Sequence, residues 1–165
     1  MKGLLNVFAR NCEVRQLDAI TAGEFLDRFH RLGSTGSRYR YGLFVKRATG
    51  ARETVIPAGT LVAVATFSAP RRWRKTSSDG DCVIKSYEWV RYASLEGLRV
   101  VGGMGKLLNA FVEDVHPDDI MSYADASSED GGSVYQTLGF EMESTCEPAP
   151  GITNLKYRLK LTDWK

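Results

Sequence analysis

Apolar side chains recur at helical spacing in three parts of the chain. The first helix is predicted to open at Thr21 and to stop at Gly33, with an apolar face between them. That face comprises Phe25, Leu26, Phe29 and Leu32. A second helix is predicted over residues 104–115. The segment 127–140 predicts an acid-rich cap, a short helix and a turn at Gly139.

Between these helices, alternating or β-branched runs predict strands. The expected strands cover residues 12–17, 39–47, 60–68, 82–94, 118–125, 141–148 and 154–161. Residues 34–38 and the polar, basic segment 69–81 predict loops, and residues 48–59 predict a hairpin-like connection. The predicted helices alternate with strands along the chain, and the strands in its middle are expected to form an antiparallel meander. We therefore expect a mixed α/β (α+β) fold. Its mostly antiparallel central sheet is flanked by helices.

Composition narrows the class of protein. A chain of 165 residues, 43% hydrophobic and 25% charged, predicts one globular domain over residues 1–165 and excludes general disorder. No apolar run is long enough for a membrane span, and the first residues lack a signal cleavage site, so we expect a cytoplasmic protein. Cys12, Cys82 and Cys146 are widely spaced without a metal-binding pattern, and we expect them to be buried free thiols.

Charge is unevenly distributed along the chain. Residues 28–75 hold eleven lysines and arginines but one acid, Glu53, whereas the whole chain has a net charge of only +2. Such asymmetry indicates a polyanionic partner on one face. The alternative is that folding brings the basic and acidic parts together, so that their charges largely cancel.

Three glycines, Gly102, Gly103 and Gly105, precede or open the second predicted helix. Glycine costs roughly 0.5–1 kcal/mol inside a regular element, so this cluster needs a physical reason. Either the chain turns tightly against a neighbouring strand, or an anion approaches the backbone amides at the helix N-terminus.

Two segments together resemble signatures of the GNAT acyltransferases. Residues 99–104 (RVVGGM) resemble their Gln/Arg-x-x-Gly-x-Gly/Ala pyrophosphate loop, and residues 133–140 (SVYQTLGF) resemble their Tyr-x-x-Leu-Gly-Phe turn. The resemblance implies an acyltransferase that uses acetyl-CoA or another acyl-CoA. The residues expected at the coenzyme are Arg99, Val100, Val101, Gly102, Gly103, Met104, Gly105 and Lys106. Met104 departs from the pattern because Gly or Ala is expected there, and a larger side chain could crowd the pyrophosphate.

The same resemblance implies an acid and a base for catalysis. Tyr135 corresponds to the general acid that protonates the departing thiolate, although a tyrosine packed on the short helix is the structural alternative. Glu88 lies where some GNAT enzymes keep a general base. An ion pair with Arg91 or Lys85 is the alternative for this carboxylate.

Two further residues have weaker claims to a role in catalysis. Asp125 ends a predicted strand and could orient a substrate amine, anchor a cation or cap the next helix. His30 follows the first predicted helix, where a histidine is either structural or functional. Together with Tyr135 these residues make a metal conceivable, but they form no recognised ligand signature.

A narrower likeness concerns the phage-associated GNAT branch that includes Mom-type proteins, which modify adenine in DNA. It rests on short segments such as FLDRFHRLG, LVAVATFSAPR and YEWVR, and on the spacing from Asp125 to Tyr135. It implies DNA as a partner, contacted by the basic segment 71–75, whose cations suit phosphates and whose tryptophan suits an extruded base. These residues are Arg71, Arg72, Trp73, Arg74 and Lys75.

Three functions are therefore considered. The first is acyl transfer to a nucleic-acid base, the second is N-acetylation of a small-molecule or protein amine, and the third is an inactive GNAT-like binding module. The basic segment argues weakly against cationic substrates, which favour acidic pockets. The oligomeric state does not follow from the sequence.

Overall fold

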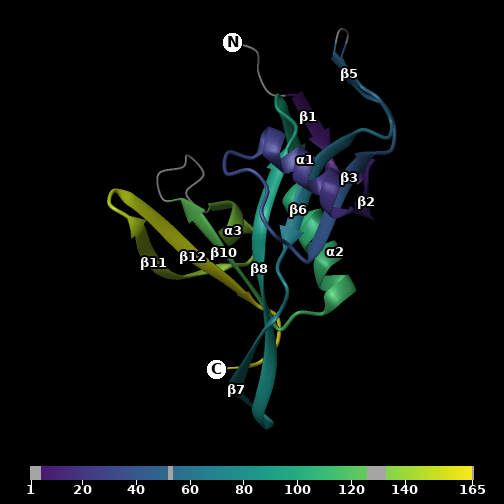
Figure 1. Cartoon of the computed structure of the whole chain (residues 1–165). Coiled ribbons are helices and arrows are strands. Elements are labelled where there is room, and N and C mark those ends of the chain that lie inside the picture. The colour runs from purple at the N-terminus through teal and green to yellow at the C-terminus, as the bar shows by residue number, and fades with distance from the viewer. Residues whose placement is uncertain (1–4, 52–53, 126–132, 165) are drawn as a thin grey trace. The chain divides into compact units, whose positions relative to one another are not determined.

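The chain divides into two compact units in a computed structural model that describes residues 5–51, 54–125 and 133–164. Unit 1 comprises Met1–Ser68 and Val90–His116, and unit 2 comprises Ala69–Trp89 and Pro117–Lys165. Strand β8 (Gly80–Ser94) gives residues 80–89 to unit 2 and residues 90–94 to unit 1 (Figure 1). A single domain over residues 1–165 stays a prediction.

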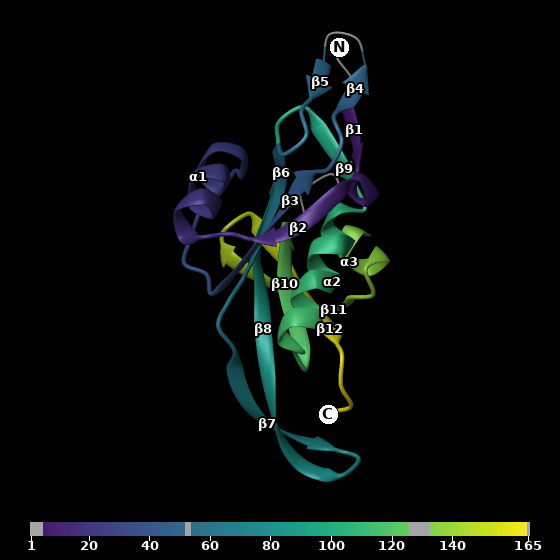
Figure 2. The same cartoon turned by 90° about the vertical axis from the view of Figure 1, so that its right-hand side faces the viewer.

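Unit 1 contains an antiparallel sheet with a helix on each face. Strands β2, β3 and β6 are neighbours in that order, and the last residues of β8 follow β6. Helices α1 and α2 both pack on β3 and β6, from opposite sides (Figure 2). The bounds are β1 (Leu5–Phe8), η1 (Ala9–Asn11), β2 (Cys12–Gln16), α1 (Ala19–Phe29), β3 (Tyr39–Val45), β4 (Thr49–Ala51), β5 (Thr54–Ile56), β6 (Leu61–Phe67), β9 (Leu98–Val101) and α2 (Gly103–Val115).

Alternation along β6 explains why helices cover both faces of the unit 1 sheet. Val64 joins the buried cluster of α1, which includes Phe25 and Leu26. Phe67 points the other way and stacks on Phe111 of α2, with ring centroids 4.0 Å apart. Because side chains point alternately to the two faces of a strand, the continuous apolar run in β6 fills two cores.

Helix α1 differs from its prediction at both ends. It begins before Thr21, because the Asp18 carboxylate accepts a hydrogen bond from the Thr21 amide and caps the first turn. It ends at Phe29, so the expected apolar position Leu32 lies beyond the helix and is 61% exposed. The other unit 1 strands and the β4–β5 hairpin agree with the patterns.

The short parallel pair β1–β9 was not predicted. The two strands lie side by side (Figure 2), with Leu5 paired with Leu98 and Phe8 with Val101. Each strand has only four residues, one of which is polar (Asn6 in β1 and Arg99 in β9). Their alternation of apolar and polar positions is too short to predict a strand. This pair places the end of β9 directly before the glycine cluster.

Unit 2 contains a mixed sheet covered by one short helix. Strand β10 is parallel to β8 and antiparallel to β12, which in turn pairs with β11 (Figure 1). The bounds are β7 (Arg71–Ser77), the first part of β8, β10 (Asp119–Asp125), α3 (Ser133–Thr137), β11 (Glu141–Ala149) and β12 (Ile152–Lys160). The predicted acid-rich cap at 127–132 lies outside the described residues, whereas the turn at Gly139 is present with φ +96°.

The prediction of a loop over residues 69–81 was wrong. Residues 71–77 form β7, which pairs with β8 in antiparallel register from Arg71 opposite Ser86 to Ser77 opposite Gly80. The tight turn between them uses Gly80 at φ +110°. A strand rich in arginine is tolerated here because most of its side chains are exposed.

The expectation that all three cysteines are buried was also wrong. All three are free, and Cys12 is buried, but Cys82 is half-buried and Cys146 is exposed. Cys146 lies in β11, which is exposed along most of its length, so the surroundings of this thiol do not bury it.

Candidate active site

The N-terminus of α2 in unit 1 is suited to bind an anion. Gly102 is the N-cap, with φ +78° and ψ 5°, and its carbonyl accepts the first helical hydrogen bond from the Lys106 amide at 3.0 Å. The amides of the first helical turn have no carbonyl partner within a helix. No acidic side chain lies in that turn, and Val101 and Gly102 are exposed. A phosphate group would therefore meet amide donors and the positive end of the helix dipole.

Adjacent glycines serve different purposes in this turn. Gly102 adopts a left-handed conformation that favours glycine, and a Cβ there would meet only the Ala9 Cβ, at 3.6 Å. At Gly103 a Cβ would lie 2.8 Å from Val100 Cγ1 and 3.0 Å from the Tyr92 hydroxyl oxygen. Tight packing therefore explains Gly103, whereas the approach of an anion to the backbone at Gly102 stays a prediction.

The side chains around the turn fit a coenzyme unequally. Arg99 is exposed on β9, and Met104 is half-buried in the first turn of α2. The Lys106 ammonium donates hydrogen bonds to the carbonyl oxygens of Ala9, at 2.9 Å, and Cys12. Its predicted contact with a pyrophosphate would require exchange of these partners, so residues 101–104 provide the better fit.

Tyr135 in unit 2 is held by aromatic packing and a hydrogen bond. Its ring stacks on Tyr157 at 5.6 Å and meets Trp89 edge-on at 6.0 Å. The Tyr135 and Ser122 hydroxyl oxygens are 2.9 Å apart, and Ser122 Oγ lies 3.1 Å from the Trp89 carbonyl oxygen. The Ser122 hydroxyl is the donor in both contacts, and because serine has one hydroxyl proton it donates to one of the two oxygens at a time.

The environment of Tyr135 keeps the phenol protonated. Burial raises the pKa of Tyr135, and the hydrogen bond with Ser122 opposes this rise without cancelling it. A protonated phenol at neutral pH is the form that a general acid requires. Sequence analysis missed Ser122, since a serine inside a strand such as MSYAD has no pattern of its own.

Glu88 lies on β8 and is partly accessible. It is opposite Met121 in the parallel pairing of β8 and β10. The carboxylate also acts on Tyr123, whose pKa is raised first by burial and then by the negative charge of Glu88. The role of Glu88 as a base stays a prediction.

His30 lies at the end of α1, and Asp125 is the last residue of β10. The His30 amide donates to the Leu26 carbonyl at the end of α1, and its Nδ1 accepts a hydrogen bond from the Leu32 amide at 3.0 Å. Burial lowers the pKa of His30, and the charges of Arg91 and Arg31 lower it further, so the neutral form of the ring is favoured. These contacts give His30 a structural task in the turn after α1. Asp125 ends β10 opposite Asn154, and a catalytic role for either residue stays a prediction.

The basic segment 71–75 is divided by its strand conformation. Trp73 and Lys75 line one cavity of unit 2, and alternation puts Arg72 and Arg74 on the other face of β7. The larger basic segment is divided as well, because residues 28–68 belong to unit 1 and residues 71–75 to unit 2. Some of its charge is used internally, as where Arg40 donates to the carbonyls of Leu17 and Ser37.

Comparison with known proteins identifies the fold. No protein-family model matches the sequence, and no curated protein matches it. The structure is similar to Arabidopsis thaliana Naa50 in complex with the bisubstrate analogue CoA-Ac-MVNAL, at 11% identity and a TM-score of 0.63, over 92% of this chain and 99% of that one. It is also similar to the Escherichia coli ribosomal-protein-S18-alanine N-acetyltransferase, at 13% identity and a TM-score of 0.61, over 92% and 94% of the two chains.

A third similar structure is the spermidine/spermine N-acetyltransferase SpeG from Vibrio cholerae, at 9% identity and a TM-score of 0.61, over 92% of this chain and 94% of that one. These similarities confirm the predicted GNAT fold, with its mixed sheet and few helices. They do not support the narrower likeness to Mom-type proteins, nor DNA as a partner. No helix in the described part of the chain is long and apolar enough to cross a membrane.

Proposed function

We propose that the protein is an acyl-CoA-dependent N-acyltransferase that acts on a primary amine of a peptide, a protein or a small molecule. The observation that carries this proposal is the N-terminus of α2, where an exposed glycine N-cap in a GNAT fold leaves amide donors open to a phosphate. Structures with the same fold were solved with CoA and a Gag peptide, and with acetyl-CoA. Others act on a ribosomal-protein alanine or on spermidine, which supports an amine acceptor.

Each proposed role follows from a side chain or an amide described above. The backbone of residues 101–104 holds the pyrophosphate, and the exposed Arg99 adds positive charge. When bound, acyl-CoA supplies an acyl group activated as a thioester. Tyr135 keeps a proton at its hydroxyl oxygen for a departing thiolate, and the Glu88 carboxylate accepts a proton from the attacking amine. General acid–base steps of this kind contribute about 10²–10⁴ each in rate.

The binding step is tested at Met104, which lies half-buried in the first turn of α2. Calorimetry with acetyl-CoA would compare wild type, Met104→Glu and the matched neutral variant Met104→Gln. A carboxylate in the first turn favours the helix dipole and repels phosphate, so the Glu variant should fold as stably but bind at least about tenfold more weakly than the Gln variant. Absence of heat with wild type for any acyl-CoA would overturn the proposal.

The acceptor is tested by thiol release from acetyl-CoA in the presence of candidate amines. A peptide with a free N-terminus and spermidine represent the two classes, and the same peptide with an acetylated N-terminus is the control. Release of thiol with the free amine alone would support transfer. Acetyl-CoA binding without turnover on any amine would instead favour the inactive GNAT-like module.

Acyl transfer to a nucleic-acid base is the second candidate. The observation in its favour is β7, on which Arg71, Arg72, Trp73 and Arg74 are all exposed. The fold comparisons support the amine acceptors better. Mass spectrometry of nucleosides from DNA of cells that express the protein is the test, and a modified base would reverse this order.

A further inference from the structure

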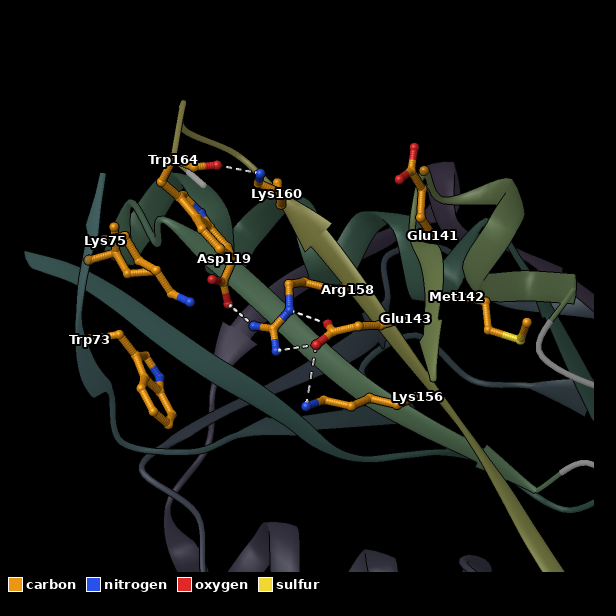
Figure 3. A pocket seen from close by; sticks show the side chains of 12 residues that line it. Trp73, Lys75, Asp119, Glu141, Met142, Glu143, Lys156, Arg158, Lys160 and Trp164 are labelled. Carbon is orange, nitrogen blue, oxygen red and sulfur yellow. Dashed lines mark hydrogen bonds and ion pairs between the residues drawn. The ribbon is translucent and has the colours of Figure 1, made fainter. Parts of the chain in front are cut away.

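Unit 2 contains a cavity of about 700 Å³ that the proposed acyl transfer does not use. Its lining residues come from β7, β8, β10, β11 and β12, from the turn at Gly139 and from Trp164 near the C-terminus. Figure 3 shows most of these side chains around the cavity. Two tryptophans, Trp73 and Trp164, and four cations, Lys75, Lys156, Arg158 and Lys160, are among the lining residues. A pocket of this volume suits a small organic ligand.

The cavity lies on the face of the unit 2 sheet that is opposite to Tyr135. On β12, Tyr157 stacks on Tyr135, whereas its neighbours Lys156 and Arg158 line the cavity. On β10, Ser122 contacts Tyr135, and Asp119 has the opposite parity and lines the cavity. Because strand side chains alternate, α3 and the cavity are on different faces.

Arg158 and Lys160 are already held in place by other groups. The Arg158 guanidinium donates to Asp119 Oδ1 at 2.9 Å and forms an ion pair with Glu143 (Figure 3). Lys160 donates to the Trp164 carbonyl, and its ammonium lies 4.2 Å from the centroid of the Trp164 ring.

The Lys75 ammonium lies 5.1 Å from the same ring. Lys75 has no carboxylate partner within the residues that the structure describes. Positive charge and an aromatic surface therefore meet at one place.

Two buried polar atoms in the cavity wall have no partner among the described residues. They are Asp119 Oδ2, on a side chain that is fully buried, and Trp164 Nε1, on a residue that is 8% exposed. The first is an acceptor and the second is a donor. Buried polar atoms are normally hydrogen-bonded, so this pair indicates a ligand edge that offers both a donor and an acceptor.

We propose that this cavity binds a nucleotide. A nucleobase is planar, can stack on the half-exposed Trp73, and presents a donor beside an acceptor for Asp119 Oδ2 and Trp164 Nε1. A phosphate attached to it would pair with the Lys75 ammonium, and lysine binds phosphate as a point charge. Neither an inorganic anion nor a neutral aromatic ring alone would use all of these groups.

The experiment separates the ring from the charge. Binding of uridine monophosphate, uridine and inorganic phosphate is measured by calorimetry, and by the fluorescence of the two cavity tryptophans, with coenzyme A at saturation. Uracil is chosen because it offers an N–H between two carbonyls and shares no adenine with coenzyme A. Adenosine monophosphate is a second probe under the same conditions. We expect a nucleotide to bind at least about tenfold more tightly than uridine or phosphate.

Variants connect that binding to the cavity. Trp164→Phe keeps an aromatic ring but removes the N–H, and should weaken nucleotide binding about tenfold. Lys75→Gln should weaken nucleotide binding and leave uridine binding unchanged, whereas Arg72→Gln, on the other face of β7, should change neither. The proposal is overturned if neither nucleotide binds, if phosphate binds as well as the nucleotides, if coenzyme A abolishes binding, or if Lys75→Gln behaves as Arg72→Gln does.

Discussion

Tyr135 and Ser122 show how one side chain can be both a packing residue and a proton donor. The Tyr135 ring is fixed by Trp89 and Tyr157, and its hydroxyl is oriented by Ser122. Packing and catalysis were alternatives for Tyr135 in the sequence. The geometry is compatible with both at once, because packing fixes the ring and leaves the hydroxyl to hydrogen bonding.

Replacement of Tyr135 by Phe removes the proton and keeps the ring contacts. We expect kcat to fall by about 10²–10⁴, while the calorimetric Kd for acetyl-CoA changes little. Ser122→Ala is the companion variant, and it should lower kcat by less because it removes the contacts of Ser122 with Tyr135 and the Trp89 carbonyl but leaves the tyrosine proton in place. An unchanged kcat in Tyr135→Phe would assign the residue to packing alone.

Thr66 offers a test of stability at the same scale. It is 1% exposed on β6, and its Oγ1 has no hydrogen-bond partner in the described part of the chain. Thr66→Val keeps the shape and removes the unsatisfied group, so the free energy of unfolding should rise by up to about 1 kcal/mol. Thr60→Val is the control, because Thr60 Oγ1 donates to the Pro57 carbonyl at 2.7 Å and its loss should destabilise. Equal effects of the two changes in denaturant unfolding would contradict this account.

At the scale of elements, β7 marks where sequence patterns fail. Most of the regular elements were predicted, the longer helices from helical spacing of apolar residues and the strands from alternating or β-branched runs. The segment RRWRKTS was assigned to a loop because most of its residues are charged or polar. Trp73 is its one large apolar residue, and a single residue cannot show the alternation of apolar and polar positions that is typical of a strand. The signal that could have found it is the Asp-Gly of the turn to β8, which is typical of hairpins.

The second candidate function makes its own prediction at β7. If nucleic acid binds there through phosphates, log Kd should vary with log salt concentration. On duplex DNA the slope should become shallower by about 0.9 for each phosphate that the protein no longer neutralises. Arg72→Gln with Arg74→Gln should therefore flatten the slope and weaken binding to every sequence alike, in a gel-shift series from low to physiological salt. No binding at low salt would remove this candidate.

At the scale of the molecule, His30 makes stability depend on pH. Burial and two nearby arginines lower the pKa of His30, so the folded protein binds its proton less readily than the unfolded chain. The associated stability is complete above the ordinary histidine pKa of about 6.5 and is lost as the pH falls through the lower, folded value. Protonation also breaks the hydrogen bond from the Leu32 amide to Nδ1.

His30→Asn supplies the matched variant for this pH dependence. Wild type should lose more unfolding free energy than the variant between pH 7.5 and pH 5, since asparagine does not titrate. Denaturant unfolding at both pH values measures the two losses. Equal losses would show that other groups dominate the acid response.

Long-range features separate what the sequence could and could not predict. The GNAT fold was predicted from two short signatures, because each of them is a run of consecutive residues that can be recognised in the sequence. The cavity did not, because Trp73, Asp119 and Trp164 are far apart in sequence and carry no shared pattern. For the same reason the net charge of residues 28–75 did not reveal that they are divided between two units.

The β1–β9 pair has a consequence for synthesis of the protein. Strand β1 has no partner until β9 has been synthesised, because Leu5 pairs with Leu98, a residue about 90 positions later in the chain. At 5–20 residues per second, translation leaves β1 without this pairing for roughly 5 to 20 s. During that interval the apolar residues Val7 and Phe8 are available to chaperones on the ribosome. The strand pairing that leads into the turn before α2 therefore forms only after β9 has been made.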